Sequence, residues 1–168
     1  MVPDTDGGWS VTETERGGSG DLAQWQRKLA PMAFNRAWEL LDRTELSPEE
    51  EDEMLAAAFA QRYHWYEIGD ARTRSIADWQ VSRVAAVLGH ADLARRFGFR
   101  SLEVAQAHNL GPFLEGFAHE AIARAAAVVD DVETFTEHLN EAKALVGAID
   151  EDDERATLEA DLSEMAGD

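Results

Sequence analysis

Several charged and polar side chains fall inside segments whose pattern predicts helices. They are His64, Glu67, Asp78, Arg83, His119, Glu120 and Arg124. Glu120 and Arg124 are four residues apart, in the order that favours an ion pair along one helix. The planar guanidinium of arginine can also bond both oxygens of a carboxylate. Two hypotheses follow: buried ion pairs that fix the register between helices, or a groove in which Arg83 and Arg124 bind a carboxylate.

A metal site is the alternative chemistry for some of these residues. His64 with Glu67, and Glu115 with His119, each place an imidazole and a carboxylate on one helical face. Facing helices of bundles bind metals through such pairs, typically as Glu-x-x-His. Neither pair has that order and spacing, and a core histidine beside Trp65 is the favoured interpretation of His64. These four residues therefore form a minor alternative, and no cofactor is predicted.

Other catalytic templates are missing from the sequence. There is no Gly-rich phosphate loop, no G-x-S-x-G and no H-E-x-x-H motif. Because the chain has no cysteine, disulfides, thiolate zinc sites and cysteine nucleophiles are excluded. The acidic run 150–154 lacks the alternating ligands and central glycine of a calcium loop. The sequence thus favours a non-catalytic protein, with an enzyme as the alternative.

The charge of the chain restricts its partners. Its 168 residues include 34 acidic and 15 basic ones, for a formal net charge of −19. A nucleic-acid binder needs a basic stripe, and none is present. Anionic membrane surfaces are disfavoured for the same reason. Proteins or peptides, basic ones above all, are the expected partners. The alternative is that the acidity only keeps the protein soluble.

Length and composition predict the domain organisation. At 168 residues and 45% hydrophobic content, the chain is expected to form one domain with a buried core, over 21–168. Residues 1–20 are rich in Gly, Ser, Thr and acid, so we predict a disordered tail. There is no apolar run of about 18 residues and no secretory signal pattern, so no membrane span and a cytoplasmic location are expected.

Capping residues predict where the first helices begin and end. Asp21 can cap a first helix, and Pro31 must lie in a first turn or break the helix. Ser47-Pro48 followed by acids is a strong helix start, and Gly69 is well placed to stop that helix.

Residues 70–107 are expected to form a helical hairpin, with one helix through Leu88 and the next from Ala91. Gly98 lies within its second helix, where a glycine usually lets another helix approach closely. Further helices are predicted over 113–129 and 132–149, and a last one after the acidic run. Since no segment alternates with period two, we predict an all-α fold of about seven helices.

An internal repeat supports stacked hairpins. RVAAVLGHADLARRFGFRSLEVA (83–105) aligns with RAAAVVDDVETFTEHLNEAKALV (124–146) at an offset of 41 residues. Self-similarity at this period is typical of hairpins that bury their apolar faces on one another. Arg83 aligns with Arg124, so stacking would place both along one surface.

Within this repeat the sequence resembles tetratricopeptide repeats. Gly89 matches the turn glycine, Ala94 the small residue that follows, and Leu102 the apolar residue late in the second helix. The resemblance covers about 70–149. It implies a right-handed α-solenoid, an array of antiparallel helical hairpins whose concave face holds a peptide or partner helix.

The chain also departs from that family. Gly98 and Ser101 stand where the family usually has an aromatic residue and an alanine, and Asp130 and Phe135 replace the turn glycine and the alanine in the second copy. The runs RYHWYEIG, WQVSRV and FAHEAIAR are similar to a group of uncharacterised bacterial proteins of this type. That similarity bears on the fold and implies no activity.

The sequence therefore predicts a binding or adaptor module for a protein or peptide. The residues expected to line or brace its groove are Trp79, Arg83, His119, Glu120 and Arg124. The second hypothesis is an enzyme or small-ligand binder with a metal or polar pocket, built from His64, Glu67, Asp78 and His119. A third is a homodimer, because two repeats leave an apolar end face uncovered.

Overall fold

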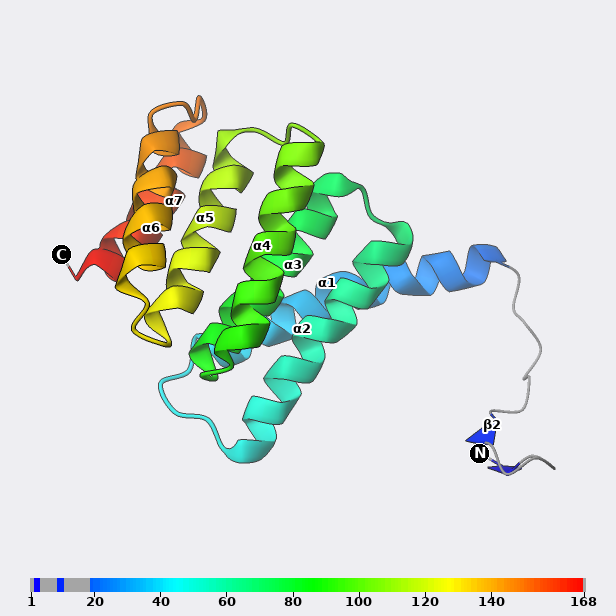
Figure 1. Cartoon of the computed structure of the whole chain (residues 1–168). Helices are drawn as coiled ribbons and strands as arrows, with labels where there is room; N and C mark the ends of the chain where they lie inside the picture. The colour runs from blue at the N-terminus through cyan, green and yellow to red at the C-terminus, as the bar shows by residue number, and fades with distance from the viewer. Residues whose placement is uncertain (1, 4–8, 11–18, 168) are drawn as a thin grey trace.

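The computed structural model describes residues 2–3, 9–10 and 19–167, and this part of the chain is helical apart from one short ladder (Figure 1). Its seven helices are α1 (Ser19–Leu41), α2 (Pro48–Ile68), α3 (Ala71–Val87), α4 (Ala91–Ala107), α5 (Pro112–Ala127), α6 (Val132–Val146) and α7 (Asp152–Ala166). The prediction of an all-α fold with about seven helices is confirmed.

The predicted disordered tail, 1–20, lies largely outside the described residues. Of that segment the structure describes β1 (Val2–Pro3) and β2 (Trp9–Ser10), which pair as a two-residue antiparallel ladder. Ser19 and Gly20 already belong to α1. None of the described helices is both long and apolar enough to cross a membrane.

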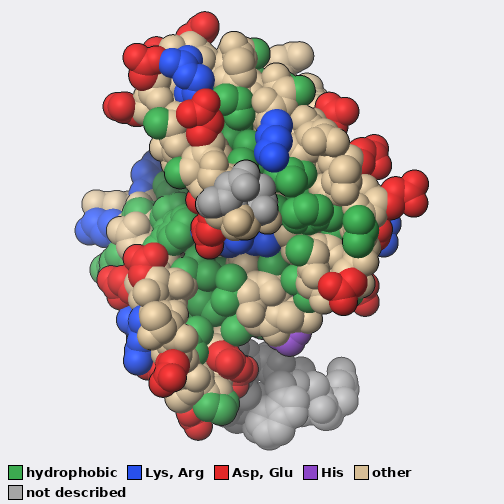
Figure 2. All heavy atoms as spheres, turned by 90° about the vertical axis from the view of Figure 1, so that its left-hand side faces the viewer, with side chains coloured by type: hydrophobic (Ala, Val, Ile, Leu, Met, Phe, Trp, Pro, Cys, Tyr) green, Lys and Arg blue, Asp and Glu red, His purple; other side chains and the backbone are tan. Residues whose placement is uncertain are grey.

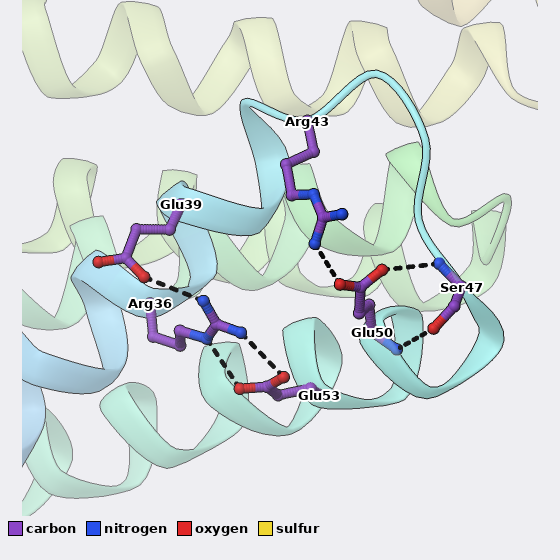
Figure 3. A network of polar contacts seen from close by, with 6 residues as sticks. All are labelled: Arg36, Glu39, Arg43, Ser47, Glu50 and Glu53. Atoms are coloured by element: carbon purple, nitrogen blue, oxygen red, sulfur yellow. Dashed lines mark hydrogen bonds and ion pairs between the residues drawn. The ribbon is translucent and has the colours of Figure 1, made fainter.

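Side chains at the helix starts satisfy backbone N–H groups that have no partner within the helix. Before α2, the Ser47 hydroxyl accepts a hydrogen bond from the Glu50 N–H, and the Glu50 carboxylate accepts one from the Ser47 N–H at 2.9 Å (Figure 3). This backbone hydrogen bond lowers the pKa of Glu50. The side chains of Asp70 and Asp131 cap α3 and α6, where each accepts a hydrogen bond from the backbone N–H three residues later. The predicted start of α2 is therefore a complete capping box.

Ion pairs join α1 to α2 on the surface (Figure 3). Arg36 donates to both carboxylate oxygens of Glu53, at 2.8 and 3.0 Å, and to Glu39 on its own helix. Arg43 pairs with Glu50, the residue of the capping box. Since these groups are largely exposed, they contribute little to stability and chiefly fix the register of the two helices.

The expectation for Pro31 was wrong, because α1 continues through it. A proline inside a helix leaves the carbonyl four residues earlier, that of Arg27, without its helical donor. Arg27 is exposed, so a water molecule can donate a hydrogen bond to this carbonyl instead. In Figure 1 the N-terminal half of α1 extends beyond the other helices.

Consecutive helices pack in pairs. The closest packing joins α1 with α2, α3 with α4, and α5 with α6; α5 also contacts α3 and α4, and α7 packs on α5 and α6. In Figure 1, α3 lies behind α4 and α7 lies behind α6. Pro112 begins α5 41 residues after Ala71 begins α3, and Val132 begins α6 41 residues after Ala91 begins α4. The offset of the sequence repeat is thus the offset between these helices.

The two largest apolar clusters of the core lie toward the two ends of the helix array, and smaller clusters between them join α3, α4 and α5. One apolar cluster joins α1 to α4 and includes Leu40, Met54 and Phe97. A second joins α5 to α7 and includes Phe117 and Leu158. The packing of α7 on α5 therefore gives the C-terminal helix a core of its own.

Two glycines allow the helices around α5 to approach closely. A Cβ at Gly98 of α4 would lie 3.0 Å from Ile122 Cγ1 of α5, so the predicted close approach at this glycine is confirmed. A Cβ at Gly116 of α5 would lie 2.5 Å from Leu158 of α7. The small residues thus set the distances of both α4 and α7 from α5.

Candidate functional site

Four of the five predicted site residues meet at one buried carboxylate. Glu120 of α5 is completely buried. Trp79 Nε1 of α3 donates to Glu120 Oε2 at 3.0 Å, and Arg124 Nε, one turn further along α5, donates to Oε1 at 2.6 Å. Arg83 Nη1 of α3 lies 3.6 Å from the same Oε1. The repeat-equivalent arginines Arg83 and Arg124 therefore share one acid.

Arg83 extends this network to two further helices. Its Nη1 donates to Asp161 Oδ2 of α7 at 2.9 Å. Its guanidinium lies 5.4 Å from the ring of Trp38 on α1 and 5.7 Å from that of Trp79, within range of cation–π attraction. The sequence interpretation missed Trp38 and Asp161, because neither lies in the repeat.

Helices α3 and α7 form the two sides of a groove whose floor is α5. Among the described residues, no Cα atom of α3 comes within 8 Å of one of α7. Their side chains meet in two ion pairs, Arg72 with Glu154 at 3.2 Å and Arg83 with Asp161 at 2.9 Å. We call the space between these pairs the α3–α7 groove.

An apolar cavity of about 210 Å³ opens in this groove. It is lined by Ser75, Ile76, Trp79, Ser101, Phe113, Leu114, Phe117 and Thr157. The Ser75 hydroxyl donates to the Ser101 carbonyl at 3.2 Å, and the Ser101 hydroxyl donates to the Ser75 carbonyl at 3.0 Å. Each hydroxyl proton therefore has an acceptor within the protein. Phe113 and Phe117 share a helical stripe with Glu120 and Arg124, and that spacing is a signal that could have identified them in the sequence.

The groove is acidic on one side. The segment 150–166, which includes α7, has eight acidic residues and a single basic one, Arg155. Figure 2 views the molecule from the side of its C-terminus: hydrophobic side chains gather in the middle of this face, and acidic side chains lie mostly toward its edge. Within the described residues, Arg124 Nη2 is buried without a hydrogen-bond partner.

His119, the fifth predicted residue, lies apart from the other four. Its Nδ1 lies 2.8 Å from Nδ1 of His138 on α6, and the ring of Phe99 packs edge-on against His138. Burial lowers the pKa of both imidazoles, and the neighbouring imidazole lowers that of His119 further. Both rings are therefore neutral near pH 7, and one Nδ1–H donates to the other Nδ1.

Asp78 belongs to a third polar cluster, on the side of α3 that faces α2 and α4. Arg62 Nε donates to the completely buried Asp78 at 2.5 Å, and the Tyr66 hydroxyl donates to its second oxygen. Arg100 Nε of α4 lies 3.7 Å from Asp78 Oδ2. Burial and the Asp78 carboxylate raise the pKa of Tyr66. Five of the seven polar residues singled out in the sequence are thus divided among three separate clusters, and His64 and Glu67 on α2 belong to none of them.

The candidate metal ligands are not brought together. His64 and Glu67 lie on α2 while Glu115 and His119 lie on α5, and these two helices do not contact one another. No three histidine, aspartate or glutamate side chains of the described part of the chain are grouped so that they could hold a metal ion. The alternative of a bundle metal site at these residues therefore has no geometric support.

Comparisons with known proteins do not add to this geometry. The chain matches no protein-family model, no curated protein and no solved structure. The resemblance to tetratricopeptide repeats stays a prediction from the sequence. The function of the groove has to be inferred from its own chemistry.

Proposed function

We propose that the protein is a non-catalytic adaptor, a tetratricopeptide-like stack of helical hairpins that binds a peptide segment of a partner protein in the α3–α7 groove. The paired packing of α1 with α2, α3 with α4 and α5 with α6 supports the stack, as does the 41-residue offset between the last two pairs. In this arrangement α3, α5 and α7 are the first helices of successive hairpins, and α7 ends the array.

The observation that carries the proposal is the apolar cavity beside the buried charge network. Trp79 belongs to both, since its ring lines the cavity and its N–H donates to Glu120. Protein interfaces concentrate their binding energy in pockets for apolar anchors, with tryptophan and arginine enriched among the central residues. The α3–α7 groove has Trp79 in the wall of its cavity and Arg83 at one end, in the pair with Asp161, so it combines these two residue types.

The bonding of the charged groups supports a binding role over catalysis. Glu120 accepts from Trp79 and Arg124 and lies close to Arg83, so its oxygens are already engaged. A general base needs a lone pair directed at the proton that it removes. The carboxylate is instead placed to hold α3 and α5 in register.

Position-specific photocrosslinking in cells of the source organism tests the proposal. A photoreactive phenylalanine analogue would replace Thr157, an exposed residue at the rim of the cavity, or Thr136, an exposed threonine of α6 outside the groove. We expect a partner protein to be crosslinked from position 157 and not from position 136. Equal capture from both positions, or capture from 136 alone, would contradict a binding site in the groove.

A further inference from the structure

Resting on the proposed function, we infer that the cavity of the α3–α7 groove receives one large apolar side chain of the partner, an aromatic one in particular, and that basic residues flank this side chain in the partner's sequence. The volume of the cavity, the rings around it and the charge of α7 together select this chemical class of bound segment.

The volume of the cavity suits a single side chain. An apolar cavity of about 150 Å³ in another protein stays dry and binds benzene, so about 210 Å³ accommodates one ring with its methylene group. The hydroxyls in the wall, those of Ser75 and Ser101, are bonded to one another's backbone. The third hydroxyl of the wall, that of Thr157, donates to the Asp153 carbonyl at 2.7 Å. All three hydroxyl protons are thus already used and the remaining lining side chains are apolar, so the cavity favours an apolar side chain.

The rings that line the cavity favour an aromatic occupant. Phe113 packs edge-on against Phe117 with their centroids 5.0 Å apart, and Trp79 packs edge-on against the same ring at 5.4 Å. A further ring between them can make the edge-to-face contacts that aromatic side chains prefer, beyond the energy of burying its area. An aliphatic side chain would gain only the burial.

The two ion pairs limit the width of the opening. Arg72 with Glu154 and Arg83 with Asp161 join α3 to α7 on either side of the cavity. Between them the rim is formed by α3 and by Thr157 of α7. The backbone of the bound segment must therefore stay outside, across the α7 side of the groove, while one side chain enters.

The charge of that side determines the residues beside the anchor. Residues 150–166 include eight acidic residues and a single basic one, Arg155. The Arg155 guanidinium is already paired with Asp152 and donates a hydrogen bond to the Ile149 carbonyl. Asp153, one turn before Thr157 on the same side of α7, is exposed, and so is Glu151 just before the helix. Lysine or arginine next to the anchor would be attracted here, whereas an acidic segment would be repelled.

Calorimetric titration with three capped pentapeptides tests the inference on the full chain. They are Lys-Lys-Phe-Lys-Lys, Lys-Lys-Ala-Lys-Lys and Glu-Glu-Phe-Glu-Glu. At low ionic strength we expect the basic phenylalanine peptide to bind about tenfold or more tightly than the alanine peptide, because only phenylalanine buries a ring. The acidic peptide should bind most weakly. Benzene should compete with the phenylalanine peptide and leave binding of the alanine peptide unchanged.

Two variants of α7 test whether the phenylalanine side chain of the peptide binds in the cavity. Thr157→Trp puts a bulky ring at the rim of the cavity, and Ala156→Trp adds the same ring at the preceding exposed position of α7. With melting temperatures matched to the wild type, Thr157→Trp should abolish the preference for phenylalanine over alanine and keep that for basic over acidic peptides. Ala156→Trp should keep both.

Equal binding of the phenylalanine and alanine peptides to the wild type would overturn the inference. So would equal binding of the acidic peptide, or competition by benzene against the alanine peptide. If crosslinking from position 157 nonetheless captures a partner, the proposed function stands and only the class of its ligand is wrong. Peptide selectivity without such capture would contradict the adaptor role and leave the specificity of the cavity intact.

Discussion

At the scale of single residues, Glu120 holds the groove together. We predict that Glu120→Ala lowers the free energy of unfolding by about 3 kcal/mol, since removing one partner of a buried ion pair leaves the other charges uncompensated. Arg124 would lose its carboxylate and Trp79 its acceptor. Equilibrium urea unfolding measures the effect. The matched control Glu159→Ala, at an exposed position of α7, should change stability by less than about 0.5 kcal/mol. An equally small change for Glu120→Ala would mean that the carboxylate is not buried in solution.

The pair of His119 and His138 should make the free energy of unfolding depend on pH. Burial lowers the folded-state pKa of His119 and His138 below 6.5, so the unfolded chain binds protons first as the pH falls. Stability from this pair is therefore complete above about pH 6.5 and is lost as the pH falls below it. Urea unfolding at pH 7.5 and 5.5 should show the loss.

The variant His119→Gln should reduce this pH dependence, because it removes one of the two imidazoles whose pKa is lowered in the folded protein. His108→Gln, at an exposed histidine, is the control and should leave the dependence as in the wild type. An unchanged dependence in His119→Gln would argue that other groups cause it.

The repeat alignment explains which site residues the sequence could predict. Arg83 and Arg124 occupy equivalent positions, so their meeting follows from stacking α3 beside α5. His119 is adjacent to Glu120, but successive helical residues point about 100° apart, and His119 faces α6 instead. Asp161 had no equivalent in the repeat, so its pairing with Arg83 depends on a tertiary contact that periodicity does not contain.

At the scale of elements, local chemistry determined the helix ends. The Ser47 capping box and the Asp131 cap were both predictable, because each bonds only to its own first turn. Pro31 was mispredicted, because a proline is tolerated where the freed carbonyl remains accessible to water. Local rules succeed where partners are local, and they fail where the surroundings of the helix decide.

The packing of α7 on α5 depends on the absence of a side chain at Gly116. A side chain at Gly116 would meet Leu158, which is completely buried. Gly116→Val should therefore displace α7 and lower the free energy of unfolding by about 1–3 kcal/mol, as overpacking does. Hydrogen exchange should accelerate in α7 more than in α3 and α4.

Gly147→Ala is the matched control for this substitution. Gly147 ends α6 in a helical conformation, with φ −67°, and a Cβ there would meet nothing within 4 Å. The variant should be neutral or gain up to about 1 kcal/mol. Uniform acceleration of exchange across all helices in Gly116→Val would contradict a separately seated α7.

At the scale of the whole molecule, composition and periodicity were enough for the fold class. Apolar residues at helical spacing predicted the seven helices, and the 41-residue repeat predicted the offset of α5 and α6 from α3 and α4. The α3–α7 groove was not predictable. It depends on how far α7 lies from α3, and that distance follows from the packing of Gly116 against Leu158 rather than from any pattern along the chain.

Stability should be distributed unevenly along the molecule, and two tryptophans test this. Trp79 lines the cavity and holds Glu120, so Trp79→Ala should lower the free energy of unfolding by about 3–5 kcal/mol. Trp25, in the N-terminal half of α1, is 60% exposed, so Trp25→Ala removes few contacts and should lower the free energy of unfolding by less than about 0.5 kcal/mol. Urea unfolding over a range of protein concentrations measures both.

A large, concentration-dependent loss for Trp25→Ala would contradict this distribution. Trp25 lies in a stripe of exposed apolar residues along α1, formed by Leu22, Trp25, Leu29 and Met32. Stability that depends on this stripe and on protein concentration can come only from a surface buried between chains. That result would favour the homodimer hypothesis and place its contact on α1, away from the α3–α7 groove.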